Sequence, residues 1–359
     1  MHHATDDRPT AMVIDSTALS TVVTDPSRFG LVVGGGSIGR RHAENLCALG
    51  AEVAVVETDA DVRTTLVSDL DVDGYTSLTE ALGATNPDFV VVATPNSTHV
   101  DLAIEAAEAG CHLFVEKPLS DRLERVDTLE SIVADRDLIT LVGCNLRFHP
   151  EIERIRSLLE QGVIGDVVAA RIEGGSYLPD WFPESDYSES YSARPDLGGG
   201  VILDYIHEIN YARWFFGEFQ TVSAMASQQS ALDIETNDVA GIVARVSDGP
   251  LCEFHLDYVQ REYSRSCHII GEAGTIRWSW NDARVEWYTA ADDEWHTFVR
   301  PDDWARNDMY RDEMQHFLDC LQTGSETTCP ISSGRRDLEV ALAARESATS
   351  GRHVELPSR

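Results

Sequence analysis

The sequence from Phe29 to Gly39 reads Phe-Gly-Leu-Val-Val-Gly-Gly-Gly-Ser-Ile-Gly, and this stretch decides the fold of the chain. Its first five residues are mostly apolar and end in two β-branched valines, which predicts a short buried strand. A G-x-G-x-x-G motif follows at once, and residues 40–49 then have the pattern of a helix that stops at Gly50. A second strand is expected over residues 52–57. This order of elements predicts a βαβ unit of a parallel sheet.

The three glycines of the motif have separate tasks in such a unit. Gly34 allows a tight turn, Gly36 lets the backbone approach a pyrophosphate, and Gly39 permits close packing of the helix on the strand. The motif alone is a weak signal, but a strand, the glycines, a helix, a strand and a terminal acid in this order are a strong one. The first part of the chain is therefore predicted to bind a dinucleotide.

Glu57, at the end of the second strand, bears on which dinucleotide is bound. It lies at the distance from the motif where an acidic side chain accepts hydrogen bonds from the ribose hydroxyls of NAD. A carboxylate would repel the 2′-phosphate of NADP, so NAD is expected. Arg40 and Arg41 keep NADP open as an alternative, because a nearby arginine could receive that phosphate.

Strands and helices go on alternating as far as residue 143. The expected elements are a strand at 88–93, a loop at 94–99, a helix at 100–109, a strand around 113–115, a helix at 121–135 and a strand at 138–143. Such alternation predicts a parallel sheet, and open sheets of this kind bind ligands at the carboxyl ends of their strands. Thr94, Asn96, Lys117 and Asn145 follow these strands and are expected at that edge.

The second half of the chain is richer in strands. Strand lengths and turn residues predict strands at 167–173, 238–246, 251–259, 266–270, 275–280 and 284–288, and helices at 307–321 and 335–349. A run of strands without intervening helices indicates a mostly antiparallel sheet. We therefore expect an α/β protein with a disordered acidic tail at 1–28, a dinucleotide-binding domain at 29–147 and a second, α+β domain at 148–359.

Lys117 is the only lysine of the chain, and every other strong base is an arginine. An ammonium can shift its pKa and exchange a proton, whereas a guanidinium in a protein stays charged, so a lysine spared at one position indicates chemistry there. The alternative is that one lysine survived by chance. The preceding residues, 113–115, read as a buried strand that ends at Pro118, which places Lys117 at the ligand-binding edge of the sheet.

A second candidate for chemistry follows the glycines 198–200, where a helix is expected to begin. Asp204 and His207 are three residues apart and would share one face of that helix. A carboxylate beside a histidine raises its basicity and fixes its tautomer, as a general base requires. Taken alone, the pair is better explained as a satisfied contact on an amphipathic helix. Beside a dinucleotide motif and a lone lysine, we interpret it as catalytic.

Composition limits the functions open to the chain. Its 359 residues include 61 acidic and 28 basic ones, and the formal charge of −33 would repel nucleic acid and anionic membranes. An acid excess with arginine in place of lysine is typical of adaptation to high salt, although a GC-rich genome also replaces lysine by arginine. The seven cysteines form no C-x-x-C pair, which argues against a disulfide framework or a metal site. No apolar run approaches the roughly 20 residues of a membrane span and no signal peptide is recognisable, so a cytoplasmic protein is expected.

Together these motifs resemble the glucose-fructose oxidoreductase, inositol dehydrogenase and rhizopine-catabolism (Gfo/Idh/MocA) family. The resemblance covers about residue 29 to the end, and its most specific parts are Glu116-Lys117-Pro118 and the helix with Asp204 and His207. It implies an N-terminal Rossmann domain and a C-terminal α+β domain whose open, mostly antiparallel sheet forms a homo-oligomer, a dimer or a tetramer. It also implies NAD(P)-dependent oxidation or reduction of a sugar, a cyclitol or a sugar derivative. Many members have the Asp and His four residues apart rather than three, which leaves their division of labour open.

The resemblance assigns roles to individual residues. The catalytic residues would be Lys117, His207 and Asp204, with His207 taking the hydroxyl proton, Lys117 orienting the hydroxyl and Asp204 holding His207. The cofactor would lie on Gly34, Gly36, Ser37, Ile38, Gly39, Glu57, Thr94, Pro95, Asn96, His99, Glu116 and Asn145. The substrate would be bound by Lys117, Arg147, Tyr177, Trp181, Tyr191 and His207, although interdomain packing is an alternative for Trp181.

The residues around Arg147, Trp181 and Tyr191 look like a subgroup associated with surface-polysaccharide and nonulosonate gene clusters. An acidic, acetamido or nucleotide-linked sugar would fit such residues, because aromatic rings stack on a sugar face and an arginine binds carboxylate or phosphate. Two alternatives stay open. One is a non-catalytic sensor that keeps the dinucleotide fold, and the other is a glycosidase that uses a retained NAD.

Overall fold

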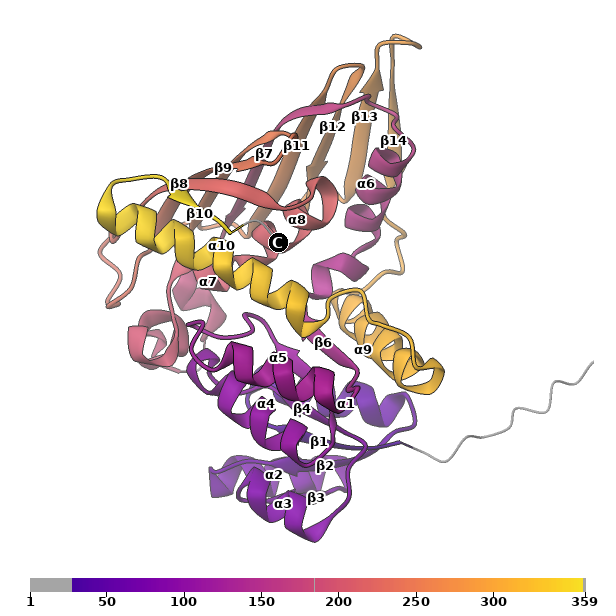
Figure 1. The fold of residues 1–359 in the computed structure, drawn as a ribbon, viewed down its shortest axis with the longest axis vertical. Coiled ribbons are helices and arrows are strands. Elements are labelled where there is room, and N and C mark those ends of the chain that lie inside the picture. The colour runs from indigo at the N-terminus through magenta and orange to yellow at the C-terminus, as the bar shows by residue number, and fades with distance from the viewer. Residues whose placement is uncertain (1–27, 184, 358–359) are drawn as a thin grey trace, which may run out of the picture.

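The computed structural model describes residues 28–183 and 185–357. The predicted acidic tail, residues 1–28, therefore lies almost wholly outside the described residues. Two sheets dominate the described chain, with one below the other in Figure 1. Within these residues, none of the helices combines the length and the apolar character needed to cross a membrane.

The first sheet is parallel and has the strand order β3-β2-β1-β4-β5-β6. Its elements are β1 (Phe29–Val33), α1 (Ser37–Ala48), β2 (Glu52–Val56), α2 (Ala60–Leu70), β3 (Asp73–Tyr75), α3 (Leu78–Ala84), β4 (Phe89–Val92), α4 (His99–Glu108), β5 (His112–Glu116), α5 (Val126–Asp135) and β6 (Thr140–Gly143). The order reverses between β1 and β4, and ligands bind at such a switch point. The predicted parallel sheet is confirmed.

The first sheet is covered on both faces. On one face, α3, α4 and α5 pack against β1, β4 and β5 through apolar residues such as Val90, Leu113 and Leu129. On the other face, α1, α2 and α9 (Arg306–Thr323) pack against the same strands, with Phe317 of α9 in edge-to-face contact with Phe89 and Phe114. A helix from the end of the chain thus completes the core of the N-terminal sheet.

The second sheet has nine strands in the order β14-β13-β12-β11-β7-β10-β9-β8-β15. Its elements are α6 (Pro150–Glu160), β7 (Val167–Gly175), α7 (Val201–Asp204), α8 (Ile206–Phe216), β8 (Phe219–Ser227), β9 (Val239–Val246), β10 (Leu251–Asp257), β11 (Ser264–Gly271), β12 (Gly274–Ser279), β13 (Arg284–Thr289), β14 (Glu294–Val299), α10 (Ile331–Ser350) and β15 (Val354–Glu355). Within this second sheet, β7 and β10 are the one parallel pair among the described strands. The expectation of a mostly antiparallel second sheet is confirmed.

Helices cover one face of the second sheet and leave the other open. In Figure 1, α6, α8 and α10 lie along one side of the strands, and their apolar residues form the largest core cluster with the inward residues of the sheet. Burial alternates along β9 and β10, so the other face is exposed. Exposed large apolar residues on that sheet include Val168, Met225, Val243 and Leu251.

Two predicted helices differ from the structure near the site. The helix expected at 121–135 begins only at Val126, because Arg125 has a φ of 64° and this left-handed conformation cannot continue a helix. The helix expected after the glycines 198–200 is broken at Tyr205, which separates α7 from α8. The break changes the direction in which Asp204 points relative to His207.

Candidate active site

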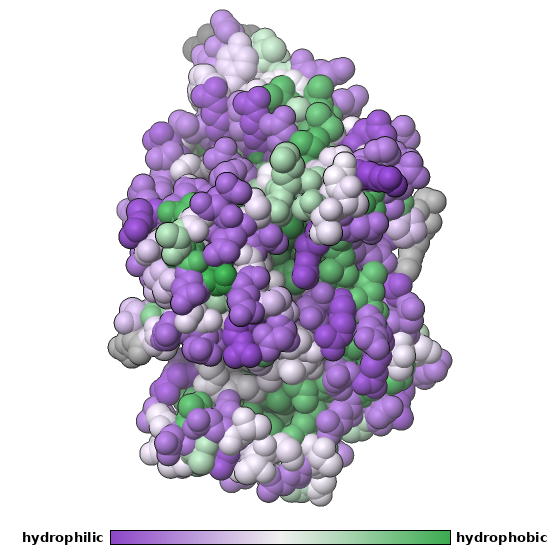
Figure 2. All heavy atoms as spheres, turned by 90° about the vertical axis from the view of Figure 1, so that its left-hand side faces the viewer, coloured by the Kyte–Doolittle hydropathy of each residue, from purple (hydrophilic) through white to green (hydrophobic). Residues whose placement is uncertain are grey.

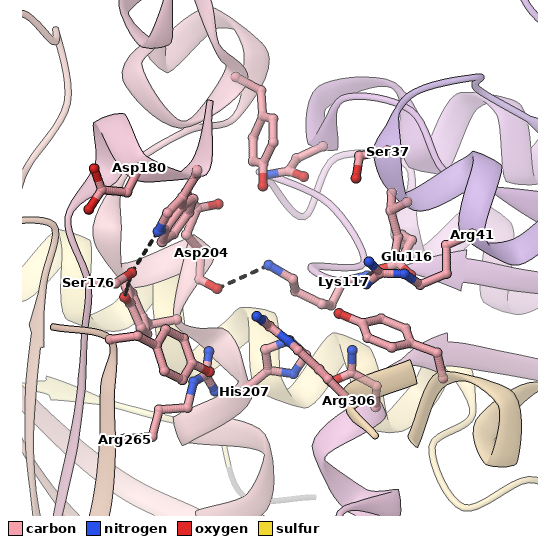
Figure 3. Close-up of a pocket in the computed structure, with 18 of the residues that line it drawn as sticks. Ser37, Arg41, Glu116, Lys117, Ser176, Asp180, Asp204, His207, Arg265 and Arg306 are labelled. Atoms are coloured by element: carbon pink, nitrogen blue, oxygen red, sulfur yellow. Dashed lines mark hydrogen bonds between the residues drawn. The ribbon is translucent and has the colours of Figure 1, made fainter. Parts of the chain in front are cut away.

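A cavity of about 550 Å³ lies between the carboxyl edge of the first sheet and the second sheet (Figure 3). The first part of the chain lines it with Ser37, Ile38, Arg41, Thr94, Asn96, His99, Glu116, Lys117 and Asn145. The second part lines it with Ser176, Tyr177, Asp180, Trp181, Tyr191, Asp204, Tyr205, His207, Arg261, Tyr263, Arg265, Arg306 and Tyr310. The cavity thus joins the predicted cofactor edge to the predicted catalytic residues.

The glycine loop has the geometry of a pyrophosphate cradle. Gly34 has a φ of 102°, and a Cβ there would lie 2.3 Å from the carbonyl oxygen of Ala93. A Cβ at Gly39 would lie 1.9 Å from the oxygen of Gly34, so the helix can approach the strand only without a side chain. Gly36 faces open space and caps α1 without a side-chain hydrogen bond, which leaves amides at the helix N-terminus for an anion. The residues present therefore fit a dinucleotide.

Glu57 is folded against this loop. Its Oε2 accepts a hydrogen bond from the amide of Gly35 at 2.6 Å, and its Oε1 accepts one from Asp59 at 2.8 Å. Arg40 is occupied elsewhere, because it pairs with Glu44 and Asp69 at 2.8 and 2.7 Å. A carboxylate therefore stands at the expected ribose position and Arg40 is neutralised, whereas Arg41 lines the cavity without an ion pair among the described residues.

Lys117 follows β5 and points into the cavity. Its Nζ donates a hydrogen bond to the backbone oxygen of Asp204 at 3.1 Å, the contact drawn in Figure 3. Beneath it, Glu116 contacts buried His42 at 2.6 Å and accepts a hydrogen bond from the amide of Lys117 at 3.1 Å. Burial raises the pKa of Glu116, but the hydrogen bond and charge of His42 and the charge of Lys117 outweigh it, so the net pKa lies below the usual range. An anionic Glu116 helps to fix the backbone from which Lys117 projects.

His207 lies on α8 and also lines the cavity. Burial lowers its pKa well below the ordinary value of 6.5, and the positive charges of Lys117, Arg265 and Arg306 lower it further. Its Nδ1 is buried and has no hydrogen-bond partner in the part of the chain that the structure describes. The ring is therefore neutral near pH 7 and can accept a proton.

Asp204 does not hold His207, so the expected arrangement of this pair is wrong. The Oδ2 of Asp204 accepts a hydrogen bond from the hydroxyl of Tyr258 at 2.5 Å, and its buried Oδ1 has no partner among the described residues. Burial raises the pKa of Asp204, and the charge of Lys117 opposes this. The break at Tyr205 explains the difference, since the two residues no longer lie on one continuous helix. Through its backbone oxygen, Asp204 positions Lys117 instead.

The cofactor residues predicted from the sequence fall into two groups. Ser37, Ile38, Thr94, Asn96, His99, Glu116 and Asn145 line the cavity, whereas Gly34, Gly36, Gly39, Glu57 and Pro95 do not. His99 ties two loops together, because its ring nitrogens lie 2.8 Å from the carbonyl oxygens of Pro118 and Thr94. Asn96 donates a hydrogen bond to the oxygen of Gly198 at 2.9 Å and so links the first sheet to the glycines before α7.

Most of the predicted substrate residues also reach the cavity. Tyr177, Trp181 and Tyr191 line it, and the indole nitrogen of Trp181 donates a hydrogen bond to Ser176 at 2.6 Å. Trp181 also contacts the ring of Tyr258 edge to face, so it serves both packing and the cavity wall.

Arg147 does not line this cavity, and its predicted contact with the substrate lacks a geometric basis. Its side chain is buried, and its Nε donates a hydrogen bond to Asn210 at 2.8 Å. A second hydrogen bond goes to the backbone oxygen of Thr328. The turn after β6 directs the guanidinium toward the start of α10 rather than toward the sheet edge.

The sequence did not single out several residues of the cavity wall, namely Ser176, Asp180, Tyr205, Arg261, Tyr263, Arg265, Arg306 and Tyr310. One signal was available, because Arg261, Tyr263 and Arg265 alternate with a period of two and so share one side of an extended segment. Arg306 and Tyr310 carried no such signal. They reach the cavity only because α9 packs on the first sheet.

One buried cluster combines possible metal ligands among the described residues: Cys144, Cys329 and Asp337. Asp337 is already engaged, since it accepts hydrogen bonds from Arg213 and, at 2.6 Å, from Asn210. A carboxylate held by a guanidinium is a poor ligand for a cation, so this cluster carries no metal assignment.

Comparison with known proteins places these features in context. A family model described as "Oxidoreductase family, NAD-binding Rossmann fold" matches residues 29–144, and one described as "GFO/IDH/MocA C-terminal domain" matches residues 152–277. Myo-inositol 2-dehydrogenase of Thermotoga maritima is 28% identical over 348 residues, which are 90% of this chain and 97% of that protein. Levoglucosan dehydrogenase of Pseudarthrobacter phenanthrenivorans is 36% identical over 146 residues, 40% of this chain and 37% of that protein. A solved structure of levoglucosan dehydrogenase with NADH has the same fold, with a TM-score of 0.84 at 20% identity over 93% of this chain and 100% of that one.

Proposed function

This chain belongs to the Gfo/Idh/MocA family of NAD-binding oxidoreductases, and on that premise we propose that it is an NAD-dependent dehydrogenase of a sugar, a cyclitol or a sugar derivative. One observation carries the proposal. A lysine at the carboxyl edge of the dinucleotide-binding sheet and a neutral histidine from the second half of the chain line the same cavity. A hydroxyl placed between them would meet a fixed positive charge and a base.

The cavity supplies what oxidation of an alcohol needs from the protein. Bound NAD would supply the hydride acceptor. The ammonium of Lys117, held by the backbone oxygen of Asp204, would orient the substrate hydroxyl and stabilise the negative charge that develops on its oxygen. His207 would take the hydroxyl proton, since its neutral ring is available near pH 7. In the reverse direction His207 would return the proton to a carbonyl oxygen held by Lys117.

NAD rather than NADP is the proposed cofactor. The carboxylate of Glu57 stands against the glycine loop, where it would accept hydrogen bonds from ribose hydroxyls and repel a 2′-phosphate. Arg40 is paired with Glu44 and Asp69 and offers no free charge to that phosphate. Thr94, Asn145 and the N-terminus of α1 would bind the rest of the dinucleotide.

A homo-oligomer formed through the second sheet is also proposed. The outer face of this sheet carries no helix of the described residues and exposes Met225, Val243 and Leu251 on neighbouring strands. Apolar residues gathered on an open sheet face mark an association surface. Met225→Asp should lower the mass measured by light scattering in solution, and an unchanged mass would contradict this surface.

We propose from the composition that the protein is cytoplasmic and adapted to high salt. All seven cysteines are free, as in a reducing cytoplasm, and hydrophilic residues dominate the face shown in Figure 2. An excess of 33 negative charges would repel nucleic acid and anionic membranes. Repulsion among these charges within the protein would be weakest at high salt, because the Debye length falls to about 3 Å at 1 M.

A substrate panel tests the proposed function. Purified protein in molar KCl would be mixed with NAD and with neutral sugars, cyclitols, uronates, sugar phosphates or UDP-sugars, and the absorbance of NADH would be followed. Stoichiometric NADH formation from at least one compound is expected. Glycoside cleavage without net NADH would favour the NAD-retaining glycosidase. Binding of NAD without turnover of any compound would favour the sensor.

A further inference from the structure

The cavity is cationic although the chain is strongly acidic. Five basic side chains line it: Arg41, Lys117, Arg261, Arg265 and Arg306. Three carboxylates line it as well: Glu116, Asp180 and Asp204. Glu116 is bonded to His42, and Asp204 accepts a hydrogen bond from Tyr258 and lies in a buried site that raises its pKa. The cavity wall therefore carries an excess of positive charge, although the net charge of the chain is −33.

Arg261 and Arg306 differ from Arg265 in their ion pairing. Neither forms an ion pair with a carboxylate of the described residues, whereas Arg265 lies 2.8 Å from the buried carboxylate of Glu208. Elsewhere in the chain, Arg213 and other arginines pair with two acids each. Both residues are exposed and line the cavity, so their charges are free to bind an anion that enters it.

Aromatic rings hold these two guanidinium groups in place. The guanidinium carbon of Arg261 lies 3.7 Å from the ring centre of Tyr177, and that of Arg306 lies 5.3 Å from the ring centre of Tyr263. Stacking on a ring occupies the flat face of a guanidinium and leaves the N–H groups at its edge free. That edge matches the two oxygens of a carboxylate or of a phosphate.

The position of Arg261 favours the substrate over the cofactor as the source of the anion, and the direction of the Arg306 side chain does so as well. Arg41 is on α1 beside the glycine loop, so cofactor phosphates explain it sufficiently. Arg261 precedes β11 and stacks on Tyr177 of the second half of the chain, whereas Arg306 begins α9 beside α1, where Asn307 donates a hydrogen bond to Asn45 at 2.8 Å. In Figure 3, Arg306 extends toward the space beside Lys117 and His207, where the reacting hydroxyl would lie.

We propose that the substrate is a sugar with an anionic substituent, a carboxylate or a phosphate, and that Arg306 and Arg261 bind this group. The inference rests on the proposed dehydrogenase function and names the substrate class for it. Lys117 and His207 would act on a hydroxyl of the same molecule. A carboxylate on the ring and a phosphate share the recognition chemistry, and the choice between them is an outcome of the experiment.

Matched pairs of compounds test the proposal. NADH formation would be measured for glucuronate against glucose, galacturonate against galactose, and glucose 6-phosphate against glucose, with the wild type and with Arg306→Gln and Arg261→Gln. The wild type should have the higher kcat/KM for the anionic member of a pair. Each variant should lower kcat/KM for that member by about 10- to 100-fold and change the neutral member much less, as expected for loss of a hydrogen bond to a charged group.

Controls separate recognition from folding. Arg277→Gln is a matched change, because Arg277 stacks on Trp295 of the second sheet at 4.7 Å, also lacks an acidic partner among the described residues and does not line the cavity. It should leave kcat/KM unchanged. Arg306→Lys keeps the charge and should recover part of the lost activity. The dissociation constant of NAD should be the same in all variants.

Two results would overturn the inference. The first is equal kcat/KM for the neutral and the anionic member of every pair in the wild type. The second is an equal loss for both members in Arg306→Gln. If no compound yields NADH, the dehydrogenase proposal fails by itself. Calorimetric binding of the same pairs then decides the inference, which requires tighter binding of the anion and its loss in Arg306→Gln.

Discussion

Replacing Lys117 by arginine would show whether the only lysine of the chain is catalytic. Its Nζ donates a hydrogen bond to the backbone oxygen of Asp204 at 3.1 Å and lies close to the neutral ring of His207 (Figure 3). An arginine would keep the charge, but its guanidinium is planar and wider, and it cannot give up a proton. Loss of one positioned donor to a developing negative charge lowers kcat by roughly 100- to 1000-fold, about 3 to 4 kcal/mol in the barrier. We expect a loss of that size for Lys117→Arg.

Steady-state kinetics with the best substrate of the panel, followed by NADH absorbance, measure this loss. NAD affinity, measured by titration, should change little, because the contact between Glu57 and the amide of Gly35 lies outside the cavity wall that holds Lys117. Arg277→Lys is the control for the reverse exchange on the outer part of the second sheet, and its kcat should equal that of the wild type. A kcat of Lys117→Arg close to the wild-type value would refute the reasoning and reopen the sensor function.

Four further outcomes are expected. NAD should bind more tightly than NADP, and Glu57→Gln should bring the two dissociation constants closer together. Equal dissociation constants for the wild type would contradict the role of Glu57. Arg147→Gln should lower the free energy of unfolding by about 2 kcal/mol in a denaturant titration, because it removes a buried hydrogen bond to Asn210, while KM stays constant. A raised KM at unchanged stability would restore Arg147 to the substrate site. The melting temperature should rise from millimolar to molar KCl, and a flat or falling curve would exclude salt adaptation. Burial and nearby cations hold the pKa of His207 well below 6.5. The neutral ring acts as the base, so a plot of kcat/KM for oxidation against pH should decline only on its acid side, below pH 6.5. In that range the unfolded chain binds a proton at His207 and the folded protein does not, so the free energy of unfolding should also fall as the pH falls below 6.5.

The sequence by itself determined the features that depend on local patterns. The glycine motif at residues 34–39 predicted the turn and the close helix contact, because only glycine tolerates the φ of Gly34 and the 1.9 Å approach at Gly39. Alternating strands and helices predicted the parallel sheet and hence the edge on which Lys117 lies. Composition alone marked Lys117, since no other lysine exists in the chain. These features depend on residue type and on the periodicity of the backbone, and both can be read from a short stretch of sequence.

Only the tertiary structure decided which side chains meet. The i, i+3 spacing of Asp204 and His207 predicted a contact between them. The helix breaks at Tyr205, and the carboxylate of Asp204 accepts a hydrogen bond from Tyr258 instead. Arg147 follows a strand of the correct edge, yet its turn directs the side chain away. One residue of irregular backbone is enough to redirect a side chain, and periodicity does not report such a residue.

The cationic wall of the cavity shows the same limit over longer distances. Arg306 reaches the cavity because α9, near the end of the chain, packs Met314, Phe317 and Leu321 onto the sheet formed by the first strands. That packing depends on the shape and apolar area of surfaces far apart in sequence, as for Phe114 and Phe317, and no local pattern around Arg306 predicts it. The sequence therefore determined the sheet, its edge and the lysine on it, whereas tertiary packing decided the charge that surrounds the substrate.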